Sequence, residues 1–178
     1  MYTIETGYFK LDGGAMFGII PKVLWEKEAP PDSLNRIEMV TRSLLLVSES
    51  HKILIDTGNG SKWTKKYLDL YNIDLSKYNI NSSLNKYGYT TDDITDVICT
   101  HLHFDHAGGN TTYDENSVIP TFSNAIYWIS HKNWELANHP SQKDRGSFIE
   151  DDWEVLGKNN MIRLVKEQFL PGIEIHFT

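Results

Sequence analysis

The stretch His101-Leu102-His103-Phe104-Asp105-His106 places four side chains that can bind metal ions within six residues. Only seven histidines occur among the 178 residues of the chain, and random scatter seldom gathers three of them beside a carboxylate. Imidazole and carboxylate groups at this density are typical of a site for one or two metal ions. Because bound metal ions commonly serve hydrolysis, the stretch predicts hydrolytic chemistry.

The spacing within this stretch predicts how the ligands divide between two ions. Residues two apart on an extended chain point to the same side, so His101 and His103 can reach one ion while Leu102 turns into the core. Where the chain turns into a following helix, we expect Asp105 and His106 to project toward a second ion. Zinc suits these ligands best, with Mn, Fe or Co as alternatives. Two such ions lower the pKa of a water held between them, and Asp105 can bind the second ion and also orient the hydroxide.

The composition predicts one soluble globular domain over residues 1–178, because 40% of the residues are hydrophobic and the chain can bury a sizeable core. The net charge of -7, with Lys and Arg spread thinly, argues against a nucleic-acid partner. We expect no membrane association, since no apolar run approaches the ~18 residues that span a bilayer. The start of the chain does not resemble a signal peptide, and its only cysteine, Cys99, is expected in a buried strand. A cytoplasmic protein acting on a small molecule is therefore predicted.

The apolar periodicity predicts strands alternating with helices, an α/β fold. We expect strands at Tyr2–Leu11, Ser43–Val47, His51–Ile55, Val97–Cys99, Ala125–Ile129 and Ile173–Phe177. We expect helices at Ser61–Tyr71, Ser82–Tyr87 and His131–Asn138, helical patches between Ile149 and Lys166, and an irregular excursion at Met16–Trp25. The His101–His106 stretch then follows a buried strand, at the edge of the sheet where α/β folds place their chemistry.

Three segments of the chain resemble the metallo-β-lactamase superfamily. The residues from His101 to His106 match its signature His-x-His-x-Asp-His at every position, and Ile53-Leu-Ile-Asp-Thr-Gly58 resembles its Asp-Gly element. The segment Asp12-Gly-Gly-Ala-Met-Phe-Gly-Ile-Ile-Pro-Lys-Val-Leu-Trp-Glu26 resembles a bacterial branch that includes quorum-quenching N-acyl-homoserine lactonases. The resemblance covers essentially the whole chain and implies an αββα sandwich, of which these residues form the N-terminal αβ half.

The resemblance also implies roles for residues outside the stretch. It implies that Asp56 supports the metal loop through hydrogen bonds, although the sequence pattern alone is equally consistent with a simple turn former. Met16 and Phe17 correspond to residues near the cleft, where they can cover an acyl chain; a packed loop is the alternative. The implied activity is attack of a metal-bound hydroxide on a lactone or related ester. Thioester, β-lactam and phosphotriester hydrolases and nucleases are alternatives, whereas a flavodiiron-type site is disfavoured because that branch carries Glu where His103 stands.

The sequence departs from the superfamily pattern at its end. Members continue past a strand like Ile173–Phe177 into a Gly-His-Thr/Ser-x-Gly-His turn, and further Asp and His residues complete both metal sites. The sequence stops at Thr178, so we expect a fragment of an intact enzyme in which each ion keeps two protein ligands. His176 lies on the strand and is a poor substitute for the missing ligand. An exposed sheet face would allow two copies to pair as a homodimer, and an inactive fragment is the alternative to an enzyme.

Overall fold

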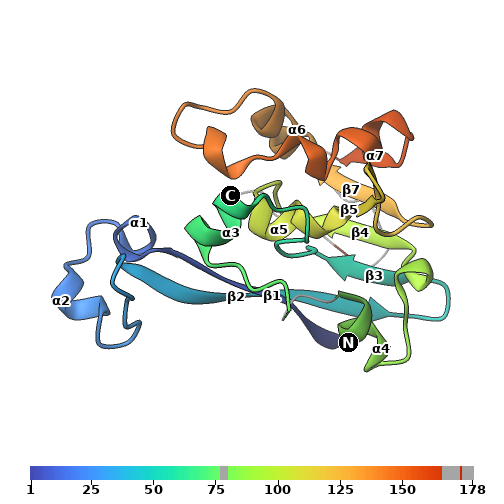
Figure 1. The fold of residues 1–178 in the computed structure, drawn as a ribbon. Helices are drawn as coiled ribbons and strands as arrows, with labels where there is room; N and C mark the ends of the chain where they lie inside the picture. The colour runs from blue at the N-terminus through green and yellow to red at the C-terminus, as the bar shows by residue number, and fades with distance from the viewer. Residues whose placement is uncertain (77–79, 166–172, 174–178) are drawn as a thin grey trace.

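Six strands form the main sheet of the computed structural model, which describes residues 1–76, 80–165 and 173 (Figure 1). In sheet order the strands are β1 (Tyr2–Asp12), β2 (Arg36–Val47), β3 (Lys52–Ile55), β4 (Asp96–Cys99), β7 (Ile126–Ser130) and β8 (Ile162–Val165). The pairs β1–β2 and β2–β3 are antiparallel, whereas β3, β4, β7 and β8 run parallel. The sheet is therefore mixed, as expected of an α/β fold.

The parallel pairing of β3 and β4 positions the His101–His106 stretch. Ile55 lies opposite Ile98 at the ends of these strands, and the amide of Asp56 donates to the carbonyl of Ile98 at 2.8 Å. All four residues of β4 are buried, which fits the apolar run Val97–Cys99 and the place of the strand between two neighbours. The residues that follow β3 and β4 consequently meet at one edge of the sheet, where this topology gathers functional groups.

Short helices pack beside the sheet. They are α1 (Gly13–Phe17), α2 (Lys22–Trp25), α3 (Lys65–Tyr71), α4 (Ile80–Asn85), α5 (Phe104–Ala107), α6 (His131–Asn138) and α7 (Glu154–Lys158), with single 3₁₀ turns at Thr91–Asp93, Gly108–Asn110, Arg145–Ser147 and Glu150–Asp152. The α6 helix has the predicted bounds, because the Ser130 hydroxyl caps it by accepting from the amide of Asn133. The main core includes buried residues from strands, helices and loops, among them Leu45, Leu54, Val97, Leu102, Tyr127 and Leu156.

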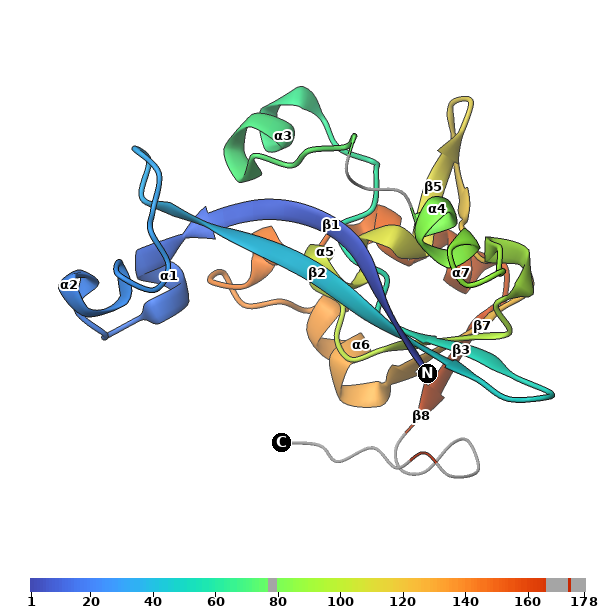
Figure 2. The same ribbon diagram turned by 90° about the horizontal axis from the view of Figure 1, so that it is seen from below.

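The β1 and β2 strands form an arm that reaches beyond the rest of the sheet and carries α1 and α2 at its far end (Figure 2). The carboxylate of Asp12 caps α1 by accepting from the amide of Ala15 at 2.8 Å. The predicted irregular excursion at Met16–Trp25 instead contains the end of α1 and all of α2, separated by Gly18, whose φ is 56°, and by Pro21. Local capping and turn residues therefore order a segment that lacks regular periodicity.

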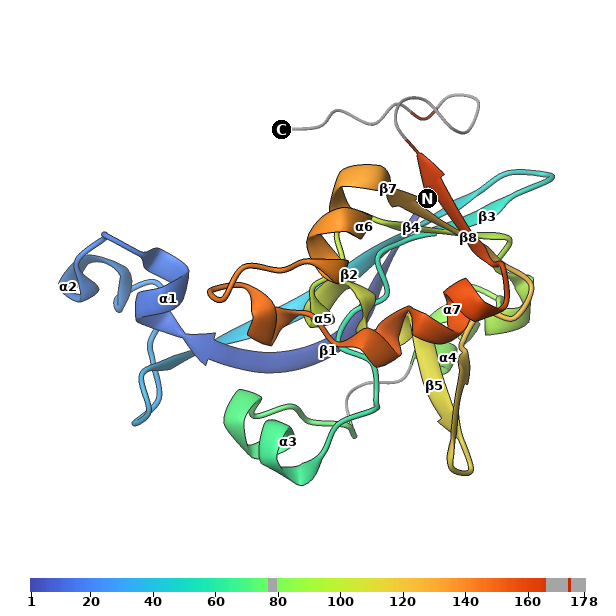
Figure 3. The same cartoon turned by 90° about the horizontal axis from the view of Figure 1, so that it is seen from above.

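Two elements differ from the sequence-based expectation. A hairpin of β5 (Thr111–Asp114) and β6 (Ser117–Pro120) projects from the body of the molecule (Figure 3), in a part of the chain for which we predicted no strand. The edge strand β8 replaces part of the expected helical patches, because pairing with β7 overrides a weak local pattern. Of the expected strand Ile173–Phe177, all but Ile173 lies outside the described residues. Among the residues that are described, no helix is both long and apolar enough to cross a bilayer.

Lys62 is a buried cation that joins three segments near the end of the His101–His106 stretch. Its Nζ donates to Asp152 Oδ1 at 2.8 Å and to the carbonyl oxygens of Gly108 and Thr111 at 2.8 and 3.1 Å. The Lys62 and Asp152 side chains are only 4% and 3% exposed. Burial raises the pKa of the Asp152 carboxyl, and the Lys62 ammonium opposes that rise. The ion pair therefore anchors the backbone that directly follows the stretch.

Replacing Lys62 with Met should lower the free energy of unfolding by about 3–5 kcal/mol, because the Asp152 carboxylate would remain buried without its cation. Urea denaturation followed by circular dichroism measures this loss. The matched control is Lys65→Met, since Lys65 pairs with Asp69 while both side chains are mostly exposed. That variant should lose less than about 1 kcal/mol. Equal losses in the two variants would contradict a structural role for the buried pair.

Candidate active site

The His101–His106 stretch connects the end of β4 to α5 and brings three imidazole rings together. The ring centroid of His101 lies 4.6 Å from that of His103 and 4.0 Å from that of His106. His106 lies on α5, which begins at Phe104 and brings its ring beside that of His101. The expected division of the four ligands between two ions stays a prediction. The carbonyl of His103 accepts from the amides of His106 and Ala107, both at 2.9 Å. The three rings therefore form one cluster.

Asp56 holds this cluster from the end of β3. Its Oδ1 accepts from the amide of Thr100 at 2.8 Å, and its Oδ2 lies 2.8 Å from Nδ1 of His106. An ionised carboxylate only accepts hydrogen bonds, so His106 Nδ1 is the donor, and in the neutral ring the lone pair is on Nε2. Pairing of a carboxylate with a ligating histidine is common in metal sites, where it orients the ring. The structure thus places Asp56 where the resemblance predicted a supporting residue.

Close backbone contact joins the loop after β3 to the end of the stretch. The amide and hydroxyl of Thr57 both donate to the carbonyl of His106, at 2.7 and 3.1 Å. Gly60 has a φ of 65°, and a Cβ at this position would collide with the Gly108 carbonyl. A Cβ at Gly108 would in turn collide with the backbone of Asn59. Glycine is therefore required at both positions. We did not predict this contact from the sequence, although both glycines are visible in it.

The environment keeps two of the three imidazoles neutral. Burial, with the neighbouring His106 and His103, lowers the pKa of His101 to about 4, and burial also lowers the pKa of His103. Burial acts against the charged form of His106 as well, but the hydrogen bond and charge of Asp56, with the charge of Asp105, raise its pKa overall. Near neutral pH, His101 and His103 consequently retain the lone pairs that a metal ion requires.

The donor set fits zinc in kind, with three clustered imidazoles and the Asp105 carboxylate, whose Oδ2 lies 3.5 Å from Nε2 of His106. Within residues 1–76, 80–165 and 173, no three His, Cys, Asp or Glu side chains converge as a finished ligand set. Cys99 is buried beside Asn110, and burial raises the pKa of its thiol to about 12, so it remains a core residue.

A cavity of about 600 Å³ adjoins the stretch. His103, Phe104 and Asp105 line it together with Ser147 of the 3₁₀ turn Arg145–Ser147 and with residues of the arm and of α3, which are Lys10, Leu11, Asp12, Ala15, Met16, Leu34, Arg36, Asp69, Leu70 and Tyr71. Of the two residues predicted to contact an acyl chain, Met16 lines this cavity. Phe17 does not; its ring stacks on Trp25 with centroids 4.9 Å apart and an interplanar angle of 11°. The α3 lining was missed because only long-range packing brings that helix to the stretch.

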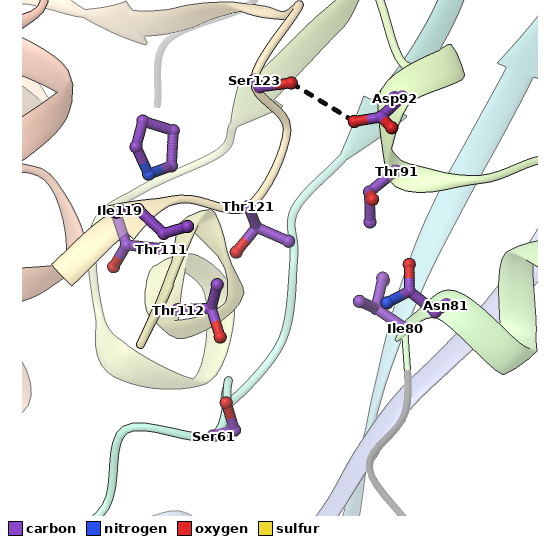
Figure 4. A pocket seen from close by; sticks show the side chains of 11 residues that line it. Ser61, Ile80, Asn81, Thr91, Asp92, Thr111, Thr112, Ile119, Thr121 and Ser123 are labelled. Carbon is purple, nitrogen blue, oxygen red and sulfur yellow. Dashed lines mark hydrogen bonds between the residues drawn. The ribbon is translucent and has the colours of Figure 1, made fainter. Parts of the chain in front are cut away.

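A second cavity, of about 460 Å³, lies between the β5–β6 hairpin and the start of α4 (Figure 4). Hydroxyl side chains dominate its described lining, including Ser61, Thr112 and Thr121. The Ser123 hydroxyl donates to Asp92 Oδ1 at 3.3 Å across one edge. None of the histidines or the aspartate of the His101–His106 stretch is among the described residues that line it. The His101–His106 stretch therefore adjoins the 600 Å³ cavity and not this one.

Comparisons with known proteins agree with this geometry. The model of the metallo-beta-lactamase superfamily matches residues 37–172. An N-acyl homoserine lactonase of Bacillus thuringiensis is 30% identical over 149 residues, which cover 75% of this chain and 51% of that protein. N-acyl homoserine lactonase AiiB of Agrobacterium fabrum is 22% identical over 191 residues, covering 98% of this chain and 65% of that protein. The chain thus spans about half to two thirds of the length of these curated relatives.

Solved structures share the fold. A probable metal-dependent hydrolase from Staphylococcus aureus superposes with a TM-score of 0.84 at 30% identity, covering 96% of this chain and 60% of that one. AidC, a dizinc quorum-quenching lactonase in complex with a product, gives a TM-score of 0.67 at 23% identity and coverages of 95% and 59%. The expected α/β metallo-β-lactamase fold is confirmed. With the family model matching most of its length, the chain belongs to the metallo-β-lactamase superfamily.

Proposed function

We propose that this protein is a metal-dependent hydrolase that opens a lactone carrying an acyl chain. The observation that carries the proposal is the 600 Å³ cavity, which has His103 and Asp105 in its lining together with apolar Met16, Leu34 and Leu70. Such a cavity suits a hydrolysable carbonyl joined to a hydrocarbon tail. The named relatives that are N-acyl homoserine lactonases support the same substrate class.

The proposal assigns the metal to the clustered side chains of the stretch. His101, His103, Asp105 and His106 would hold divalent ions, two of them by analogy with the dizinc AidC, and zinc suits these ligands best. When bound, the metal supplies a Lewis acid for the carbonyl and lowers the pKa of water. Mn, Fe and Co are alternatives to zinc.

The protein's own groups have separate tasks in this proposal. The Asp56 carboxylate holds His106 through its Nδ1 and fixes which ring nitrogen is free. Asp105, whose side chain is 19% exposed and lines the cavity, accepts a hydrogen bond from the attacking water and orients it. Met16, Leu34 and Leu70 offer apolar surface for the acyl chain in the same cavity as the Asp105 carboxylate.

Replacing Asp105 with Asn should reduce lactone hydrolysis at least 100-fold, because the amide orients water poorly and binds metal weakly. The assay follows acid release from N-hexanoyl-homoserine lactone in the presence of zinc, with a thioester, a β-lactam and a phosphotriester tested in parallel. Asp114→Asn on the exposed part of the β5–β6 hairpin is the control and should retain full activity. Full activity in the Asp105 variant, or a wild type that prefers another substrate class, would count against the proposal.

Replacing Asp56 with Asn should weaken zinc binding about 10- to 100-fold, since the charged partner of His106 is lost. Asn tolerates the left-handed backbone of Asp56, whose φ is 58°, so the fold should persist. Competition with a chromophoric chelator gives the zinc affinity, and circular dichroism checks the fold. Unchanged affinity in a folded variant would show that Asp56 serves only the turn.

A further inference from the structure

Tyr71, the last residue of α3, lines the 600 Å³ cavity together with His103 and Asp105. Its ring stacks on Phe104, with centroids 4.8 Å apart and an interplanar angle of 25°. The ring of Trp63 meets the Tyr71 ring edge-on, with centroids 5.9 Å apart and an interplanar angle of 75°. Because Phe104 lies between His103 and Asp105 in the chain, this packing fixes Tyr71 directly against the His101–His106 stretch.

Arg36 holds the end of α3 that carries Tyr71. Its Nη1 donates to the carbonyl oxygens of Asp69 and Leu70, both at 2.8 Å, at the end of the helix where backbone carbonyls lack helical partners. Asp32 in turn accepts from Arg36 Nε at 3.0 Å and pairs with its Nη2 at 2.9 Å. The position of Tyr71 is thus set by contacts on both its ring and its backbone.

The hydroxyl of Tyr71 is available to a ligand. Within the part of the chain that the structure describes, it makes no hydrogen bond to another protein group, although the residue is half-buried. Tyr71 is one of the residues that line the cavity, so a ligand bound there can supply a partner for its hydroxyl. Burial, followed by the neighbouring Tyr67 and Asp105, raises the pKa of Tyr71, so the group stays protonated at neutral pH and can donate.

We propose that the Tyr71 hydroxyl donates a hydrogen bond to a carbonyl oxygen of the acyl substrate and thereby orients the substrate toward Asp105. The identity of the ligand rests on the proposed function. Tyr71→Phe keeps the ring that packs on Phe104 and removes only the donor. Losing one neutral hydrogen bond to a ligand should weaken binding about five- to tenfold.

The experiment titrates N-hexanoyl-homoserine, the ring-opened product, into the zinc-supplemented full chain by calorimetry. Tyr71→Phe should raise the Kd about five- to tenfold while leaving the urea unfolding midpoint unchanged. The matched control is Tyr67→Phe. Tyr67 stacks on Tyr71 at 6.1 Å, but it is 40% exposed and is absent from the described cavity lining. That variant should bind as tightly as the wild type.

Equal binding by the Tyr71→Phe variant and the wild type, or no binding by the wild type, would overturn the inference. Hydrolysis of the lactone by the wild type is measured separately and reports on the proposed function. A wild type that binds the product through Tyr71 without hydrolysing the lactone would support the inference and refute the proposed function. In an active wild type, the substitution should raise KM and leave kcat nearly unchanged, because it removes binding shared by substrate and transition state.

Discussion

The Asp56 carboxylate, shared between the amide of Thr100 and the Nδ1 of His106, is the interaction on which the site depends. It joins the ends of the parallel strands β3 and β4, so the register of those strands sets where the imidazoles lie. The carbonyl of His106 is held as well, by the amide and hydroxyl of Thr57. A change in strand pairing would therefore alter the ligand positions as well as stability.

In our proposal, some residues around this carboxylate hold the His101–His106 stretch in place and others contact the substrate. Lys62 and the close contacts at Gly60 and Gly108 hold the backbone after the stretch against the loop that follows β3. The β1–β2 arm and α3 supply most of the lining of the 600 Å³ cavity, with charged as well as apolar side chains, and Arg36 ties these two elements together. In our proposal, the residues that hold the stretch in place are thus separate from the residues that contact the acyl chain.

Local sequence patterns predicted the elements that local physics controls. The apolar run Val97–Cys99 and the capped α6 helix were readable because burial and capping leave clear patterns. The edge strand β8 was not, since it depends on pairing with β7. The sequence predicted that the chain turns into a helix near Asp105 and His106, but not that this helix, α5, begins at Phe104 and brings the His106 ring beside that of His101. The sequence also did not predict that α3 lines the cavity, because no local pattern connects residues so far apart in the chain.

X-ray absorption at the zinc edge of the zinc-loaded chain tests the central claim most directly, because it reports which atoms bind the ion. We predict imidazole scattering from the histidines of the His101–His106 stretch, with Zn–N distances of about 2.0–2.1 Å. Replacing His103 with Ala should remove part of that imidazole signal. Zinc bound through oxygen atoms alone, or a spectrum that the His103 substitution leaves unchanged, would contradict the account.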